Sequence, residues 1–437
     1  MHLFKIKPYS FIILGLFFGI SLIISTCLSS FNLTFSFFSQ TFAQSSDVQV
    51  IKYRNLSLDL GNGVTTKAQL SYPAIGKGPF PGVLLVPGSG PADMNYTANN
   101  NSKLFWQIAQ YLSERGFVVL KYDKRGIDEN LTIINNDVWG NMTYNDLKQY
   151  AQRALNVLMQ QPEVDAKRIT LIGHSEGGEI VARIATTINP IFKIDNIVLM
   201  APRIEKPLDQ VYYGYVIFPI EYAKQVLDKN HTGSFSLQQA LQDPIFQSMI
   251  GSGNNNTSLN LNNASISNDT KLLKSNYNSS KDVYVNINTE LKPFLEKRFE
   301  KAFEGTKCDI LSGVPCPIYL KSLIKLQPTL NIIDKVPNST SILILHGQND
   351  SGSRVQQAFL LQQRLVELNH PDHELITYPD VGHLFYPSTR WTTESGPIPE
   401  YVLADLYSWL GSHSGFTPLH TSMTSSNPSS YSNFINK

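Results

Sequence analysis

The chain is 437 residues long and 42% of its residues are hydrophobic, enough for one large α/β domain with an insertion and a sizeable core. Its formal net charge is only +1, with 36 Lys and Arg residues against 35 Asp and Glu residues. Binding of nucleic acid needs a broad basic field on the surface. The composition therefore sets nucleic-acid binding aside.

The first 43 residues have the pattern of an export segment. Two lysines precede an apolar run from Phe11 to Ile24, and Thr41-Phe42-Ala43 resembles a small-residue cleavage site. The segment is long for a signal peptide, so a retained membrane anchor of about 20 residues is the alternative. Lipid attachment at Cys27 is a third reading. Each fate predicts that the remainder is extracytoplasmic, either secreted or tethered to the outer face of the membrane.

Two further features agree with an extracytoplasmic protein. Cys308 and Cys316 are close enough in "KCDILSGVPCP" to close a small disulfide loop in an oxidising compartment. The alternative is two free, buried thiols. Glycosylation sequons are also frequent, although an Asn-rich and Ser-rich chain produces many of them by composition: Asn55, Asn95, Asn130, Asn141, Asn230, Asn268 and Asn338.

Residues 48–202 are expected to form the first part of an α/β core. The alternating stretch 53–72 around Gly61-Asn62-Gly63 predicts a β-hairpin at the start of this part. Beyond it, apolar strand-like runs alternate with helical patterns, which predicts crossover units and a mostly parallel sheet with helices on both faces. The strands are expected in "GVLLVPGSGP", in "FVVLKYDKRG", at Ile169–Ile172 and in "NIVLMAP", and the helices at Ser102–Arg115, at Thr143–Gln160 and directly after Ser175.

The stretch "RITLIGHSEGGEIVARIA" places Ser175 at a tight corner between a strand and a helix. Such a turn strains the serine backbone, and side chains two residues away would collide with neighbouring elements, which accounts for Gly173 and Gly177. The helix N-terminus beside the hydroxyl favours negative charge that develops there. This context predicts a nucleophile.

The alternation of strands and helices stops at residues 203–340, which we interpret as an insertion. Because it falls between late strands, it is expected at the carboxyl edge of the sheet as a lid over the site; a peripheral decoration is the alternative. Helices are expected at Glu221–Asp228 and Leu291–Phe303, and the Asn-rich stretch 251–280 is expected to be a mobile loop. The core resumes at 341–412, and the Ser/Thr-rich tail 413–437 is expected to be disordered.

A serine nucleophile needs a base and an acid that orients the base. Asp350 follows the apolar run "SILILHG" and His383 follows "HELITYP", so both are expected at strand ends on the same edge as Ser175. Asp350 has the alternative of a helix cap, and Asp380 is an alternative acid. The remaining nearby histidines, His174 and His346, are expected to be structural.

Acyl transfer also needs donors for the developing oxyanion. We expect them to be the backbone N–H groups of Glu176, which follows the nucleophile, and of Ser89 in "PGSGP". The alternative for the second is a glycine turn that only connects a strand to a helix.

The motifs "PGSGP", "YDKRG", "GHSEGG", "HGQND" and "VGH" resemble those of the α/β-hydrolase superfamily, over about residues 50–202 and 341–410. "PGSGP" with "GHSEGG" is most similar to bacterial and archaeal esterases related to the serine aminopeptidase and dienelactone hydrolase groups. The resemblance implies Ser175 as nucleophile, Asp350 as acid, His383 as base, and Ser89 and Glu176 as oxyanion donors. It also implies that Asp123 and Arg125 in "YDKRG" are structural.

The sequence therefore predicts a serine hydrolase of carboxylic esters that acts on a small-molecule acyl substrate and needs no cofactor and no metal. Peptidase or thioesterase activity uses the same groups and remains open. An aminopeptidase would need a lid carboxylate for the substrate ammonium, for which Glu221, Glu290 and Glu296 are available. A binding protein on a hydrolase scaffold is the alternative outside enzymes.

Overall fold

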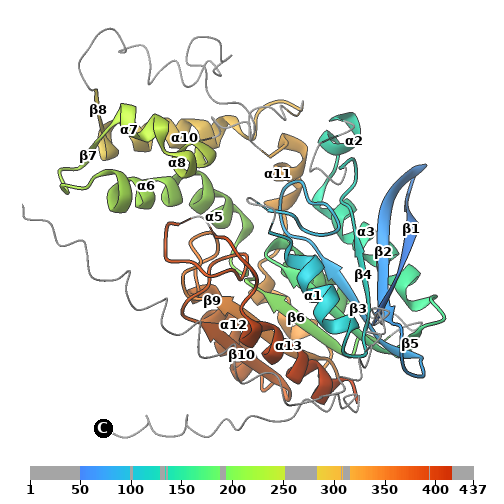
Figure 1. Ribbon diagram of the computed structural model, residues 1–437. Helices are drawn as coiled ribbons and strands as arrows, with labels where there is room; N and C mark the ends of the chain where they lie inside the picture. Colours follow the sequence, from blue (N-terminus) through green and yellow to red (C-terminus); the bar gives the residue numbers. More distant parts are fainter. Residues whose placement is uncertain are drawn as a thin grey trace, which may run out of the picture. The chain divides into compact units, whose positions relative to one another are not determined.

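The described part of the chain contains an eight-stranded sheet, visible in Figure 1. The computed structural model describes residues 50–98, 102–127, 133, 136–187, 193–250, 283–306, 308, 315–392 and 394–415. The strand order is β1-β2-β4-β3-β5-β6-β9-β10. The strands are β1 (Ile51–Gly61), β2 (Val64–Pro73), β3 (Phe80–Val86), β4 (Val118–Tyr122), β5 (Val164–His174), β6 (Asn196–Met200), β9 (Ser341–Gly347) and β10 (His373–Tyr378).

The predicted hairpin is present at one edge of this sheet. Strands β1 and β2 pair antiparallel, and β2 pairs antiparallel with β4. The turn between β1 and β2 has positive φ at Gly61, Asn62 and Gly63 (90°, 54° and 73°). Glycine and asparagine are the residues that tolerate this region best.

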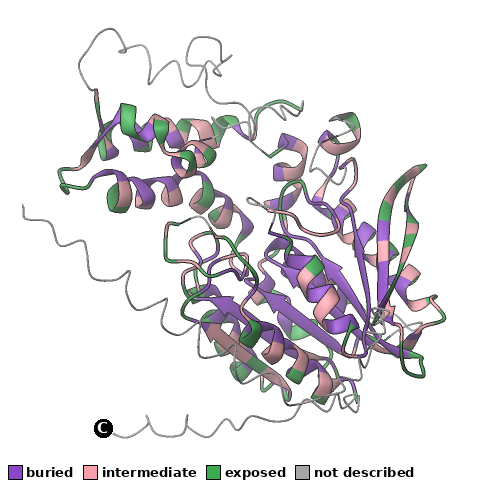
Figure 2. Ribbon diagram, in the orientation of Figure 1, coloured by how far each residue is buried: buried purple, intermediate pink, exposed green. Residues whose placement is uncertain are grey.

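The six strands from β4 to β10 in the sheet order are parallel. Their central members are buried on both faces, as Figure 2 shows in purple. In β3, Val83 and Leu85 belong to the apolar cluster with helices α1 (Leu104–Ser113) and α13 (Glu400–His413). The alternate residues Leu84 and Val86 belong to the cluster on the other face, because side chains alternate along a strand.

The second face is covered by α3 (Tyr144–Met159), α4 (Glu176–Ala185) and α12 (Gln356–Glu367). A capping box starts α3, in which Thr143 and Asp146 bond each other's backbone N–H. A short helix α2 (Asn136–Gly140) precedes it. The prediction of a mostly parallel sheet with helices on both faces is therefore confirmed.

The expected insertion between β6 and β9 is largely helical. From Pro207 to Leu227 the chain is helical without a break, as α5 (Pro207–Tyr212), a π-helical turn, α6 (Phe218–Tyr222) and a second π-helical turn. The predicted helix Glu221–Asp228 is only the end of this stretch, in which Pro219 lies near the start of α6, just after the first π-helical turn.

The remainder of the insertion adds short elements. The predicted helix Leu291–Phe303 corresponds to α10 (Lys292–Lys301), preceded by a π-helical turn, Ile287–Leu291. The others are β7 (Ser234–Ser236), α7 (Leu237–Gln242), α8 (Pro244–Met249), β8 (Tyr284–Asn286), α11 (Pro317–Leu323) and the 3₁₀ turns Thr329–Asn331 and Ile333–Lys335.

Several expectations fall outside the described residues: the export segment 1–43 with Cys27, the Asn-rich stretch 251–280, and the tail beyond residue 415. Residues 413–415 complete and follow α13. Within the part of the chain that the structure describes, no helix has the length and apolarity needed to cross a membrane.

Candidate active site

Ser175 occupies the turn between β5 and α4 in a strained conformation. Its φ and ψ are 55° and −119°, a region that non-glycine residues rarely adopt. Two backbone hydrogen bonds hold the turn: Ser175 N–H donates to the Met200 carbonyl (2.8 Å), and Gly178 N–H donates to the Ser175 carbonyl (3.0 Å). Strain of this kind, of order 1–3 kcal/mol, persists only where the surrounding structure enforces it.

The flanking glycines are required sterically, as the sequence predicts. A Cβ on Gly173 would lie 2.2 Å from the Gly177 carbonyl oxygen. A Cβ on Gly177 would lie 2.1 Å from the Val86 carbonyl oxygen in β3. Both obstacles are backbone atoms, so a rotamer change cannot relieve them. The strand, turn and helix approach closely enough only because these side chains are absent.

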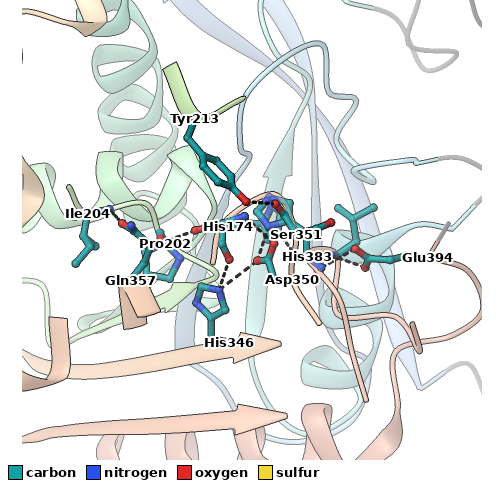
Figure 3. Close-up of polar contacts among 12 residues, drawn as sticks. His174, Pro202, Ile204, Tyr213, His346, Asp350, Ser351, Gln357, His383 and Glu394 are labelled. Carbon is teal, nitrogen blue, oxygen red and sulfur yellow. Dashed lines mark hydrogen bonds and ion pairs between the residues drawn. The ribbon is translucent and has the colours of Figure 1, made fainter. Parts of the chain in front are cut away.

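Asp350 and His383 meet at the same edge of the sheet (Figure 3). His383 Nδ1 lies 2.7 Å from Asp350 Oδ2, although the two residues follow different strands, β9 and β10. The other carboxylate oxygen of Asp350 accepts a hydrogen bond from Ser353 N–H (2.7 Å). Asp350 therefore caps the turn before α12 and orients the imidazole at once, so the two roles do not exclude each other. The exposed Asp380 is not the carboxylate at His383 Nδ1.

The electrostatics of this pair favour an ionised acid beside a basic imidazole. Burial alone would raise the pKa of Asp350, but the charges and hydrogen bonds of His383 and His346 hold it well below its usual range. Burial would lower the pKa of His383, but Asp350 raises it above 6.5, with a smaller contribution from Glu394. The site therefore stabilises an imidazolium at His383.

His174 and His346 have structural contacts, as expected. His174 Nε2 lies 2.7 Å from the His383 carbonyl oxygen, and its Nδ1 lies 3.0 Å from the Tyr96 hydroxyl. Burial lowers the pKa of His174 to about 3, which keeps it neutral. Because His174 immediately precedes Ser175, this contact ties the His383 loop to the serine turn. His346 Nε2 lies 2.7 Å from the Ser353 carbonyl oxygen.

The loop that carries Ser89 packs directly on the serine. A Cβ on Gly88 would lie 3.0 Å from Ser175 Cβ. The buried ammonium of Lys124 donates hydrogen bonds to the Gly88 and Gly90 carbonyls, and it lies 3.6 Å from the carboxylate of Glu176. Arg203 Nη2 donates to the Ser89 hydroxyl (2.7 Å). These contacts bring together Ser89 and Glu176, the two residues expected to supply oxyanion donors.

The neighbouring residues of "YDKRG" support this loop. Asp123 accepts a hydrogen bond from Met94 N–H (2.6 Å), and Arg125 donates to the Tyr150 hydroxyl (2.6 Å). Both contacts are structural, as the resemblance implies. Lys124 lies between these two residues. The sequence motif was recognised, but no role was predicted for this lysine.

Glu394 was also missed by sequence reasoning. Its carboxylate accepts hydrogen bonds from the backbone N–H groups of His383 (2.5 Å) and Leu384 (2.7 Å). It lies 11 residues beyond His383 in an irregular loop, and no spacing pattern in the sequence points to it.

A cavity of about 390 Å³ adjoins Ser89 and Glu176. Residues of both the core and the insertion line it, and Ser175 and His383 are not among these lining residues. Cys308 and Cys316, which are joined in a disulfide, contribute to its wall. Most other lining residues are apolar: Pro91, Ile133, Trp139, Met142, Leu147, Val211, Met249, Pro315, Leu320 and Leu323.

Several polar groups of the cavity wall lie beside Glu176, and Gln210, Ser248 and Arg298 also line the cavity. Tyr319, from α11 in the insertion, donates its hydroxyl hydrogen to the Glu176 carboxylate. Lys124 and Arg203 also line this side, and Arg203 Nε lies 3.5 Å from the buried carboxylate of Glu179. Among the described residues, no group of three or more His, Cys, Asp or Glu side chains could hold a metal ion.

Comparison with known proteins gives two family matches and one curated relative. A family model described as serine aminopeptidase, S33, matches residues 98–279, and one described as prolyl oligopeptidase family matches residues 314–417. Esterase EstD from Thermotoga maritima is 36% identical over 136 residues, which are 31% of this chain and 30% of the relative. The chain thus matches less than a third of that relative's length.

Solved structures of low identity are also similar. The α/β hydrolase GrgF from Penicillium sp. has 16% identity and a TM-score of 0.46 over 84% of this chain and 100% of that chain. Dipeptidyl peptidase 4 from Porphyromonas gingivalis has 15% identity and a TM-score of 0.45 over 84% of this chain and 36% of that chain. The serine turn after β5, the Asp–His pair after the two last strands and the two partial family matches fit the α/β-hydrolase fold.

Proposed function

We propose that this chain is a serine hydrolase that cleaves carboxylic esters through an acyl-enzyme on Ser175. The observation that carries the proposal is the strained turn at Ser175 together with the Asp350–His383 pair, whose Nδ1–Oδ2 distance is 2.7 Å and whose loop contacts His174, the residue before Ser175. Asp350 engages Nδ1, which leaves Nε2 of His383 to take the hydroxyl proton.

In the proposed mechanism, Ser175 Oγ attacks the acyl carbonyl carbon while His383 accepts the proton. His383 then gives that proton to the departing alcohol, and the acyl group stays on Ser175. A water molecule attacks this ester with His383 as base, and His383 then gives the proton to Ser175 Oγ as the bond to the acyl group breaks and the carboxylic acid is released. Asp350 stays ionised throughout and stabilises the imidazolium, in agreement with its lowered pKa.

The tetrahedral intermediate needs donors for its oxyanion, and we assign them to the backbone N–H groups of Ser89 and Glu176. Glu176 is the first residue of α4, and the first N–H groups of a helix have no partner within it. The loop of Ser89 is held beside Ser175 by Gly88 and Lys124. One such donor contributes about 3–4 kcal/mol to transition-state stabilisation.

The cavity beside these donors is the proposed acyl pocket. Its mostly apolar wall fits an aliphatic or aromatic acyl chain better than a charged one. An aminopeptidase would need a carboxylate to bind the substrate ammonium, but none of the three candidate carboxylates lines this cavity. Glu221 lies 3.7 Å from Arg390, Glu296 accepts a hydrogen bond from Tyr212 (3.0 Å), and Glu290 accepts one from Asn286 N–H (2.7 Å).

The test is the initial rate of hydrolysis of p-nitrophenyl esters from acetyl to decanoyl by the purified protein. We expect turnover that is lost in Ser175→Ala and kept in Ser57→Ala, which alters an exposed serine on β1. Turnover that survives in Ser175→Ala would overturn the mechanism. Turnover of aminoacyl p-nitroanilides but of no ester would favour the peptidase function, to which the matched family models give weight.

We also propose that the enzyme works outside the cytosol. The lysine-led apolar segment at residues 1–43 and the Cys308–Cys316 disulfide support this location. Amino-terminal sequencing of the protein isolated from its host separates cleavage near residue 43 from a retained anchor. Recovery of the intact chain in the cytosolic fraction would contradict the proposal.

A further inference from the structure

A second carboxylate, that of Glu394, contacts the backbone of the histidine loop. Glu394 Oε1 accepts the His383 N–H (2.5 Å) and Oε2 accepts the Leu384 N–H (2.7 Å), as Figure 3 shows. Both oxygens act as acceptors, which suits the ionised carboxylate, because a protonated carboxyl has one hydroxyl oxygen that accepts poorly. The carboxylate therefore fixes the backbone of the base itself.

The loop has room for this side chain because residue 382 is glycine. A Cβ on Gly382 would lie 2.4 Å from the Glu394 carboxyl carbon. The backbone from Gly382 to Leu384 therefore wraps closely around the carboxylate. Two charge-assisted hydrogen bonds to adjacent N–H groups define the loop far better than an exposed ion pair would.

We propose that Glu394 is a positioning residue of the hydrolase, which fixes the His383 backbone through its two hydrogen bonds to adjacent N–H groups. The proposal rests on the proposed function, in which His383 is the general base. Asp350 fixes the ring through Nδ1, and Glu394 fixes the main chain on which the ring is mounted.

The charged groups around His383 set the sign of the expected effect. The carboxylates of Asp350 and Glu394 raise the pKa of the imidazole, and Arg203 lowers it. His174, which packs on the ring, is neutral because burial lowers its own pKa to about 3. Removal of the Glu394 charge leaves Asp350 opposed by Arg203, so the imidazole becomes less basic.

The experiment compares the pH dependence of kcat/KM for wild type and Glu394→Gln on the best p-nitrophenyl ester. His383 must be neutral to accept the serine proton, so its pKa appears as the acid limb of the profile. We expect this limb to move by about 0.5–1 pH unit to lower pH in Glu394→Gln. We also expect kcat to fall by about tenfold, because one of the two backbone bonds is weakened.

Two variants separate positioning from general damage. Glu394→Asp keeps the charge but is one methylene shorter, so kcat should fall while the acid limb stays within about 0.2 units of wild type. Glu374→Gln removes an exposed carboxylate of β10 and should change neither quantity. An acid limb of Glu394→Gln that coincides with wild type would refute the proposal. If that variant does not fold, a Glu394→Asp variant with wild-type kcat would refute it equally.

The substrate does not need to be known for the second readout. In protein labelled with ¹⁵N-histidine, the ring resonances of His383, assigned through His383→Gln, report its pKa directly. A lower pKa in Glu394→Gln would support the positioning role even if no ester is hydrolysed, in which case only the proposed function fails. An unchanged pKa with normal ester turnover would refute the role of Glu394 alone.

Discussion

The buried ion pair of Lys124 and Glu176 provides a quantitative test of how the serine turn is held. The two side chains are 3% and 1% exposed, and their charged atoms lie 3.6 Å apart. Lys124 also donates hydrogen bonds to the Gly88 and Gly90 carbonyls, while Glu176 accepts one from Tyr319. Removal of either charge therefore leaves the other buried without its partner.

The expected magnitudes follow from this geometry. Lys124→Met leaves a buried carboxylate with one neutral donor, which costs about 3–5 kcal/mol of unfolding free energy. Glu176→Gln costs less, about 1–3 kcal/mol, because Lys124 keeps its two carbonyl acceptors. If the losses of the two single variants simply added, the double variant would be less stable than we expect by about 1.5–3 kcal/mol. The double variant gains this unfolding free energy because it leaves neither charge buried without its partner.

The assay is urea unfolding of the wild type, both single variants and the double variant at one pH. A matched control is Lys193→Met, which removes an exposed partner of Asp195 (2.9 Å, with Lys193 60% exposed) and should cost less than about 1 kcal/mol. If the two single effects add to within about 0.5 kcal/mol, the pair does not couple the Ser89 loop to α4, and the reasoning is refuted.

Three further predictions concern the acid–base pair, the serine turn and the cavity. Because the pKa of His383 is raised, kcat/KM of the wild type should fall as the pH drops through a midpoint above 6.5. Asp350→Asn should lower kcat by about 10³–10⁴-fold and move that midpoint to lower pH. The pH profiles of both proteins measure these effects. Gly177→Ala should prevent folding or cost more than about 3 kcal/mol in thermal unfolding, whereas Gly411→Ala, in open space on α13, should stabilise by up to about 1 kcal/mol. Gly214 lines the cavity and a Cβ there meets nothing within 4 Å; Gly214→Leu should therefore lower the rate for decanoyl esters more than for acetyl esters, and equal losses would place the acyl chain elsewhere.

The parts of the fold that the sequence predicts are those whose cause is local. Strands such as β3 and β6 are covered on both faces, so they read as continuous apolar runs. The serine turn can be predicted from the sequence because both positions that must lack a side chain, Gly173 and Gly177, fall within one stretch of five residues. Asp350 and His383 could be found because parallel strands bring their following turns to one edge.

The parts that the sequence does not predict depend on contacts between distant residues. Lys124 reaches Gly88 across 36 residues, and Tyr319 reaches Glu176 across 143. Neither contact leaves a period or motif. The helical stretch 207–227 is longer than the sequence predicts because it continues past Pro219 and because its π-helical turns depart from the 3.6-residue period.

This difference in origin implies that the two halves of the site respond differently to substitution. Ser175 is held by backbone sterics in the core, so changes around it, such as those at Gly173 or Gly177, act on folding before they act on chemistry. The His383 loop is held by polar contacts with His174 at the end of β5, with Asp350 after β9 and with Glu394 later in the same loop. Loss of one such contact leaves the sheet intact and moves only the base. Variants in the loop should therefore lose kcat at nearly constant unfolding free energy, whereas variants at the turn should lose both together.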